Sequence, residues 1–152
     1  MTKTEQLNQL LEEWKTRDSF FSNNFRYDGI INESEFEKSI PKILFVCKEP
    51  NGKNLQAPLV GDFRKEWNDN GAQYPFSYRI AEWAYGILND FPPLDEIFNK
   101  TDWEVDYKKA LQSVSFMNLK KAAGIGISEY APMTESLNRE KELAIKQIEI
   151  ID

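Results

Sequence analysis

The 152-residue sequence contains no histidine and only one cysteine, Cys47. The lack of histidine excludes Ser-His and Cys-His catalytic pairs and every histidine-ligated metal site. A single cysteine excludes an internal disulfide, a cysteine-rich zinc site and a cysteine-ligated iron–sulfur cluster. No apolar run approaches the length of a membrane span, and the start of the sequence lacks the apolar region of a signal peptide. We therefore expect a cytoplasmic protein with no membrane contact, no metal and no cofactor.

Basic residues are outnumbered, and the net charge is −6. Taken over the whole chain, this charge argues against a nucleic-acid binder, because contacts to phosphates usually need a basic surface. The charge is unevenly distributed, however. Residues 41–65 carry a net charge of +3 and residues 113–128 a net charge of +2, whereas the rest of the chain is acidic. Two positive segments are therefore candidates for contact with an anionic partner.

The length and the 41% hydrophobic content suit one globular domain. We predict a single domain over residues 1–152, with an N-terminal helical segment (1–40) and a core (41–152). Amphipathic periodicity predicts helices at 4–17, 77–89 and 134–149, with N-cap signals for the first two. Further helices are expected at 33–38, 63–68 and 104–111.

Two apolar runs predict strands, at 43–47 and at 113–119. The first is apolar on both faces, which is typical of a central strand in a parallel sheet. Helical segments separate the two strands, so we predict an α/β fold in which helices flank a parallel sheet. Each strand ends in polar residues. In open α/β sheets, ligands bind at the carboxyl ends of the strands.

Glu49 follows the first strand and precedes Pro50, so its carboxylate is a candidate catalytic group. At that edge it could act as a general base on water or stabilise positive charge that develops on a sugar. The alternative is a solvated loop glutamate, or one that pairs with Lys48 or Lys53. Cys47 is better explained as a small buried strand residue than as a nucleophile, because no histidine can activate it.

Asn118 ends the second strand, and its amide offers donors and an acceptor in one plane. That combination suits recognition of the edge of a nucleobase. The alternative is an asparagine that caps a turn. Phe63 and Phe76 are candidates for stacking on a base, or else they cover the core. Side chains that could hold phosphates, or that are simply solvated, are Lys53, Arg64, Lys120 and Lys121.

This combination resembles the uracil-DNA glycosylase-like superfamily. The resemblance rests on an apolar strand that ends in a carboxylate and a proline (43–50), a loop with phenylalanines, and a later strand that ends in asparagine (114–118). It implies a three-layer α/β/α fold with a short central parallel sheet. It also implies that Glu49 positions or activates the hydrolytic water and that Asn118 recognises the base. Phe76, or alternatively Phe63, would stack on the flipped base.

The sequence departs from this family towards its end. The family has a late loop with a histidine, which is missing here, and its third and fourth core strands would lie beyond Asp152. We therefore expect a sheet that is incomplete at the C-terminus, as in the N-terminal two-thirds of such a domain or in a shortened relative.

Three functional hypotheses follow from the sequence. The first is hydrolysis of the N-glycosidic bond of a flipped, damaged base, with DNA or a nucleotide as partner. The second is a non-catalytic nucleotide- or protein-binding module on the same fold, whose protein partner the sequence does not identify. The third is an unrelated small-molecule hydrolase that uses the same edge of the sheet.

Overall fold

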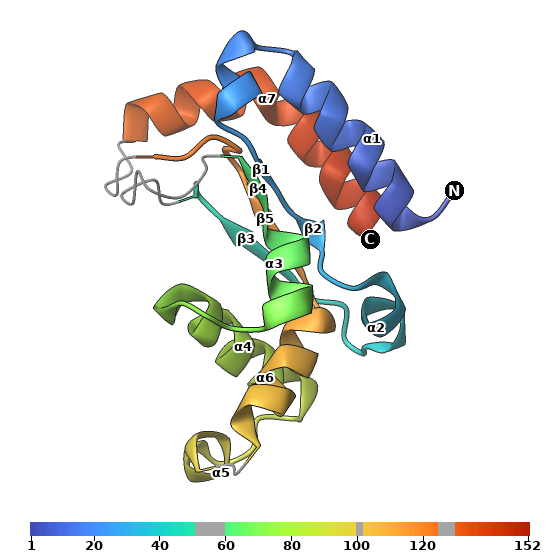
Figure 1. Cartoon of the computed structure of the whole chain (residues 1–152), viewed down its shortest axis with the longest axis vertical. Coiled ribbons are helices and arrows are strands. Elements are labelled where there is room, and N and C mark those ends of the chain that lie inside the picture. Colours follow the sequence, from blue (N-terminus) through green and yellow to red (C-terminus); the bar gives the residue numbers. More distant parts are fainter. Residues whose placement is uncertain (51–59, 100–101, 125–129) are drawn as a thin grey trace. The chain divides into compact units, whose positions relative to one another are not determined.

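The computed structural model describes residues 1–50, 60–99, 102–124 and 130–152 and has a mixed α/β fold (Figure 1). The α/β class predicted from the sequence is confirmed. Each predicted helix and both predicted strands correspond to an observed element, with ends that differ by a few residues. In chain order the elements are α1 (Lys3–Thr16), the 3-10 helix η1 (Ser19–Asn23), β1 (Arg26–Tyr27), β2 (Gly29–Ile30), α2 (Glu33–Lys38), β3 (Leu44–Cys47), β4 (Gly61–Asp62), α3 (Phe63–Asn70), α4 (Pro75–Leu88), α5 (Leu94–Phe98), α6 (Trp103–Gln112), β5 (Ser115–Asn118) and α7 (Tyr130–Ile151).

The two predicted strands pair directly in a three-stranded sheet with the order β2-β5-β3. The Ser115 N–H donates to the Ile43 carbonyl at 2.9 Å, and the Leu119 N–H donates to the Cys47 carbonyl at 2.8 Å. Residue numbers rise together on both sides of these bonds, so β3 and β5 run parallel. Their carboxyl ends therefore lie at the same edge of the sheet.

The central strand of this sheet is β5, whose four residues are all buried. In the described part of the chain β3 lies at the sheet edge, and Val46 is half exposed. The prediction that the 43–47 run forms a central strand is therefore wrong. One of its apolar side chains lies near a helix: the ring centroid of Phe45 is 6.4 Å from that of Trp83 in α4. An apolar run in a sequence predicts that its side chains are covered, but it does not predict which elements cover them.

The short strands β1, β2 and β4 were not predicted from the sequence. β1 and β4 form a parallel pair with Arg26 opposite Gly61. The Arg26 N–H donates to the Lys121 carbonyl, and the Ile31 N–H donates to the Val114 carbonyl. Residue numbers run in opposite directions across these two bonds, so β2 is antiparallel to β5. With two residues each, these strands are too short to show an alternating pattern.

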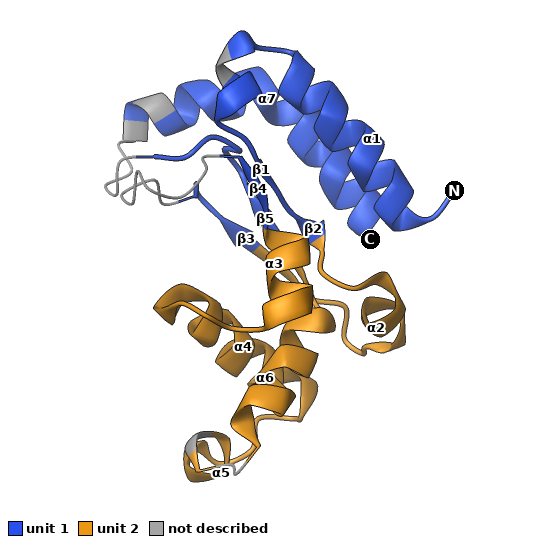
Figure 2. Ribbon diagram, viewed as in Figure 1, with its two compact units in different colours: residues 1–29, 46–62, 116–152 blue, residues 30–45, 63–115 orange. Residues whose placement is uncertain are grey.

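The chain forms two compact units (Figure 2). Unit 1 comprises residues 1–29, 46–62 and 116–152, and unit 2 comprises residues 30–45 and 63–115. Each unit is assembled from segments that are distant in the sequence, so the predicted N-terminal segment (1–40) is divided between them. The prediction of one domain over the whole chain stays a prediction.

In unit 1, α1 and α7 pack along each other (Figure 1). The helix α1 begins at a capping box, in which the Thr2 hydroxyl accepts from the Glu5 N–H and the Glu5 carboxylate accepts from the Thr2 N–H. Its periodic apolar residues are buried as expected: Leu7, Leu10, Leu11 and Trp14. Gly29 permits the close approach of Leu7, because a Cβ there would lie 3.0 Å from a Leu7 methyl group, and its φ is +128°.

In unit 2, α6 packs against α2, α3 and α4. The helix α4 begins at Pro75, where the Ser77 hydroxyl accepts from the Tyr74 N–H at 3.0 Å. It ends in a Schellman motif: Asp90 has a φ of +57°, and the Phe91 N–H donates to the Gly86 carbonyl at 2.7 Å. The helix predicted at 77–89 agrees with α4 to within two residues at each end, because the chain carries a local start signal and a local stop signal there.

Candidate functional site

Glu49 and Asn118 both belong to unit 1 and lie at the carboxyl ends of two neighbouring parallel strands, β3 and β5. Hydrogen bonding between the two chain segments continues past the strand ends, because the Lys120 N–H donates to the Lys48 carbonyl at 2.9 Å. This pairing holds the segment with Glu49 beside the segment with Asn118. The structure thus brings the predicted catalytic and base-recognising residues to the same sheet edge. Their predicted roles remain proposals.

The Glu49 carboxylate pairs with the Lys120 ammonium at 2.6 Å, and the two side chains are 9% and 21% exposed. Lys120 is thus a partner of Glu49 that the sequence did not indicate, since the partners considered there were Lys48 and Lys53. Gly124 packs against the Glu49 carboxylate. Its N–H donates to the Pro50 carbonyl, and a Cβ at Gly124 would overlap the Glu49 carboxylate. The glycine is thus required for the close approach of the chain to this acidic group.

Asn118 is 2% exposed and is held through its main chain. Its N–H donates to the Asp28 carboxylate at 2.8 Å, and its carbonyl accepts from the Lys121 ammonium at 2.8 Å. Its side-chain Nδ2 is buried and has no hydrogen-bond partner among the described residues. Buried polar groups are nearly always paired, so an unmet donor at this position requires an explanation.

Lys121 forms a fully buried ion pair with Asp28 at 2.7 Å. Its ammonium also donates to Gln147 Oε1 at 2.7 Å and lies 4.8 Å from the ring centroid of Trp14. The amide of Gln147 completes the cluster by donating to Asp28 at 2.8 Å. A phosphate could reach this ammonium only if the cluster opened, so the predicted phosphate contact of Lys121 is not supported by its surroundings.

The other predicted site residues with described positions belong to unit 2. Phe63 and Phe76 lie on α3 and α4, and their ring centroids are 5.8 Å and 6.3 Å from that of Trp67. Phe76 is 47% exposed, whereas Arg64 is buried. The predicted roles of these residues in stacking and phosphate binding stay predictions. Lys53 lies outside the described residues.

Sequence reasoning missed Asp28 and Gln147. An Asp-Gly pair such as Asp28-Gly29 is typical of an exposed turn, but Asp28 is completely buried. Gln147 lies on the apolar face of α7 with Leu143, Ala144 and Ile151, which are all buried. A polar residue at an apolar position of the helical period is a signal that could have indicated a buried polar partner.

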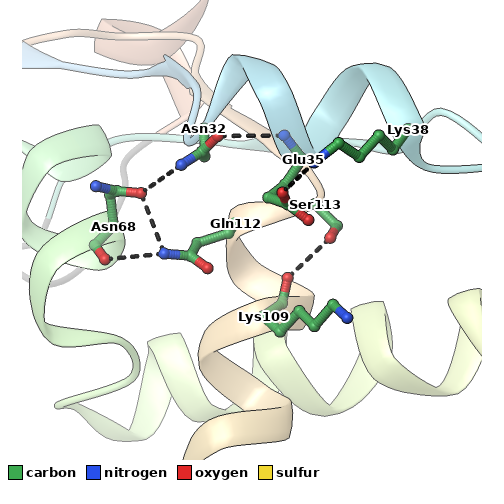
Figure 3. A network of polar contacts seen from close by, with 7 residues as sticks. All are labelled: Asn32, Glu35, Lys38, Asn68, Lys109, Gln112 and Ser113. Carbon is green, nitrogen blue, oxygen red and sulfur yellow. Dashed lines mark hydrogen bonds and ion pairs between the residues drawn. The ribbon is translucent and has the colours of Figure 1, made fainter.

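Unit 2 contains a cavity of about 600 Å³ whose lining includes Glu35, Lys38, Tyr85 and Lys109. Figure 3 shows the polar contacts beside it, where Glu35 pairs with Lys38 at 2.7 Å and the Ser113 hydroxyl donates to the carbonyl of Lys109. The pKa of the Glu35 carboxyl is lowered, first by its hydrogen bond to Lys38. The lining carries charges of both signs and does not specify one class of ligand. None of the predicted site residues with described positions contributes to this cavity.

The structure also bears on metals and membranes. No group of three or more metal-ligating side chains gathers within the described ranges. The helices in those ranges are too short or too polar to cross a membrane. Burial and, secondly, the Asp28 charge raise the pKa of the Cys47 thiol, which disfavours the thiolate needed by a nucleophile.

Comparisons with protein-family models, curated proteins and solved structures found no significant match.

Proposed function

We propose that this chain binds a pyrimidine-type base and hydrolyses its N-glycosidic bond, as the resemblance to the uracil-DNA glycosylase-like superfamily implies. The observation that carries the proposal is the buried Asn118 amide at the sheet edge that also holds Glu49, because its Nδ2 has no hydrogen-bond partner in the part of the chain that the structure describes. Leaving a buried donor unpaired costs about 1–3 kcal/mol. A ligand that supplies a carbonyl oxygen would remove this cost.

Uracil has the complementary chemistry. One edge of its ring presents a carbonyl oxygen beside a ring N–H, and a side-chain amide can donate to the first and accept from the second. A base within DNA must leave the stack to reach such a site, at a cost of a few kcal/mol. Recognition by the Asn118 amide would favour bases that offer this acceptor–donor pair.

Glu49 would direct the water. In the proposed step the water oxygen bonds to the sugar C1′, and the C–N bond breaks with its electron pair going to the departing base. The proton of the water passes to the Glu49 carboxylate. Lys120 holds this carboxylate at 2.6 Å and so fixes its orientation. The same ammonium is a source of positive charge at an edge where the departing base becomes anionic.

The second candidate function is a non-catalytic module that binds a nucleobase or nucleotide. It is favoured by the ion pair between Glu49 and Lys120, because one oxygen of the carboxylate is already engaged by the ammonium. In this alternative the pair closes the edge of a base pocket, and Asn118 provides recognition without bond cleavage.

Release of uracil from single- and double-stranded uracil-containing DNA tests the first proposal. We expect release by the intact chain, at least a hundredfold slower release by Glu49→Gln, and unchanged release by the control Glu142→Gln. Glu142 is exposed on α7 of the same unit. Release that is equal in all three proteins would contradict a catalytic role for Glu49.

An NMR titration with uracil separates the two candidates. Saturable binding that Asn118→Leu abolishes, without any release from DNA, supports the non-catalytic module and contradicts hydrolysis. If the intact chain neither binds uracil nor releases it, both candidates are wrong.

A further inference from the structure

We propose that Asp28, Lys121 and Gln147 are positioning residues that fix Asn118 for recognition of a carbonyl-bearing planar base. This inference rests on the proposed function. Together with Trp14, these three residues form what we call the clamp cluster. The cluster lies entirely within unit 1 and draws on α1, on the residue between β1 and β2, on the turn after β5 and on α7.

The clamp cluster holds both main-chain polar groups of one residue, Asn118. The Asn118 N–H donates to Asp28 Oδ2 and the Asn118 carbonyl accepts from Lys121 Nζ, each at 2.8 Å. The two holding side chains are themselves joined at 2.7 Å. Gln147 bridges them, with its Oε1 accepting from Lys121 and its Nε2 donating to Asp28 Oδ1. The result is a closed cycle in which a shift of the Asn118 main chain would break charge-assisted hydrogen bonds.

The cluster is also sealed from solvent. The side chains of Asp28 and Lys121 have no exposed surface, and neither do Gln147 and Trp14. The Trp14 ring covers the ammonium at 4.8 Å. Because water cannot replace any broken contact without entry into the core, the main chain at Asn118 has few alternative arrangements.

Stability alone does not account for such a cluster. A buried ion pair is often matched or exceeded in stability by well-packed apolar residues, because both charges lose their hydration. Here the charges converge on the main chain of a single residue. That residue retains a buried side-chain donor without a partner among the described residues. A fixed main chain together with an unsatisfied side-chain donor is expected of a preorganised ligand-binding group.

Gln147 is the most informative position to change, because its side chain hydrogen-bonds to Lys121 and Asp28 and not to Asn118 itself. The test variant is Gln147→Leu, and the matched control is Gln112→Leu in unit 2. The probes are uracil and 2-pyrimidinone, both as N1-methyl derivatives, of which the second lacks the C4 carbonyl oxygen and the ring N–H beside it. We expect Gln147→Leu to weaken uracil binding by about tenfold and to leave the weaker binding of 2-pyrimidinone unchanged. The control should leave both affinities unchanged.

The affinity ratio for the two probes distinguishes positioning from a structural role. A variant that is only less stable binds both probes in the same ratio at temperatures where it is folded. If folded Gln147→Leu binds the two probes with the same affinity ratio as the intact chain, the inference is overturned. If Gln147→Leu does not fold, the double variant Asp28→Val/Lys121→Met removes the clamp without leaving a single buried charge, and the same loss of ratio is expected.

Hydrogen exchange of the Asn118 main-chain N–H provides a readout that needs no ligand. We expect strong protection in the intact chain, faster exchange in Gln147→Leu and unchanged exchange in Gln112→Leu. Rapid exchange in the intact chain, or no change in Gln147→Leu, would contradict the clamp. Strong, Gln147-dependent protection in a chain that binds no uracil would instead support the clamp and refute the proposed function.

Discussion

The two units differ in the kind of polar group that they place between their elements. Unit 1 encloses a charged pair, Asp28 and Lys121, with no exposed side-chain surface. Unit 2 uses neutral amides, since Asn68 Oδ1 accepts from Asn32 at 2.9 Å and from Gln112 at 3.2 Å (Figure 3). This amide network joins α2, α3 and α6 and is only partly buried.

The difference shows how burial changes the free-energy cost of losing a polar contact. A partly buried amide that loses a partner can turn to water, so each contact in unit 2 can be lost separately. A buried charge cannot do so, and it requires a complete set of partners at once. The network of unit 2 is therefore expected to contribute in small increments, whereas that of unit 1 should respond to substitution as one cooperative group.

The largest expected effect is that of Lys121→Met. It leaves the Asp28 carboxylate buried without its cation, which is expected to lower the free energy of unfolding by about 3–5 kcal/mol. Urea denaturation of the intact chain and the variant measures this change. The double variant Asp28→Val/Lys121→Met should lose less than the single variant, because no uncompensated charge remains. A double variant less stable than Lys121→Met would contradict the account of the buried pair.

The next comparison concerns two glycines with positive φ, Gly29 in unit 1 and Gly71 in unit 2, at +128° and +69°. We expect Gly29→Ala to cost about 2–3 kcal/mol of unfolding free energy, because its backbone conformation is strained for alanine and a Leu7 methyl group is close. Gly71→Ala should cost about 1–2 kcal/mol, since its φ is near the left-handed helical value. Urea denaturation of both variants provides the measurement, and the opposite ranking would contradict this comparison.

A smaller effect is expected for Gln112→Leu. This substitution removes hydrogen bonds from the Gln112 amide to the carbonyl and the side chain of Asn68, at 3.1 Å and 3.2 Å. Because the groups are neutral and partly buried, we expect a loss of about 1 kcal/mol in the free energy of unfolding. The same denaturation experiment measures it. A loss as large as that of Lys121→Met would remove the distinction between the two units.

The smallest effect concerns the Cys47 thiol, which lies within reach of the Asp28 charge. Burial and that charge raise its pKa, so less thiolate is present in the folded chain than in the unfolded chain at the same alkaline pH. The rate of alkylation by iodoacetamide should therefore reach half its maximum at a higher pH in the folded chain than in urea. A midpoint equal to or below that of the unfolded chain would contradict the raised pKa of the Cys47 thiol in the folded chain.

Local features accounted for much of the fold and part of the candidate site. The longer helices α1, α4 and α7 were predictable because each carries a periodic apolar face, and α4 also has its own start and stop signals, whereas the short helices η1 and α5 were not predicted. Glu49 and Asn118 could be named in advance because polar residues directly after apolar runs lie at the carboxyl ends of strands. The two-residue strands could not be predicted, since they depend on pairing partners more than 30 residues away, as Arg26 and Gly61 illustrate.

The sequence by itself determined the α/β class, the approximate ends of the longer elements and the exclusion of histidine-based chemistry. Only the tertiary structure decided that β5 is central, that Glu49 pairs with Lys120, and that Lys121 is enclosed by Asp28 and Gln147. The physical reason is that a side chain's charge and periodicity are local properties, whereas its burial and partners depend on segments brought together by folding. Lys121 looks like any surface lysine in the sequence, and its partner Asp28 is 93 residues away.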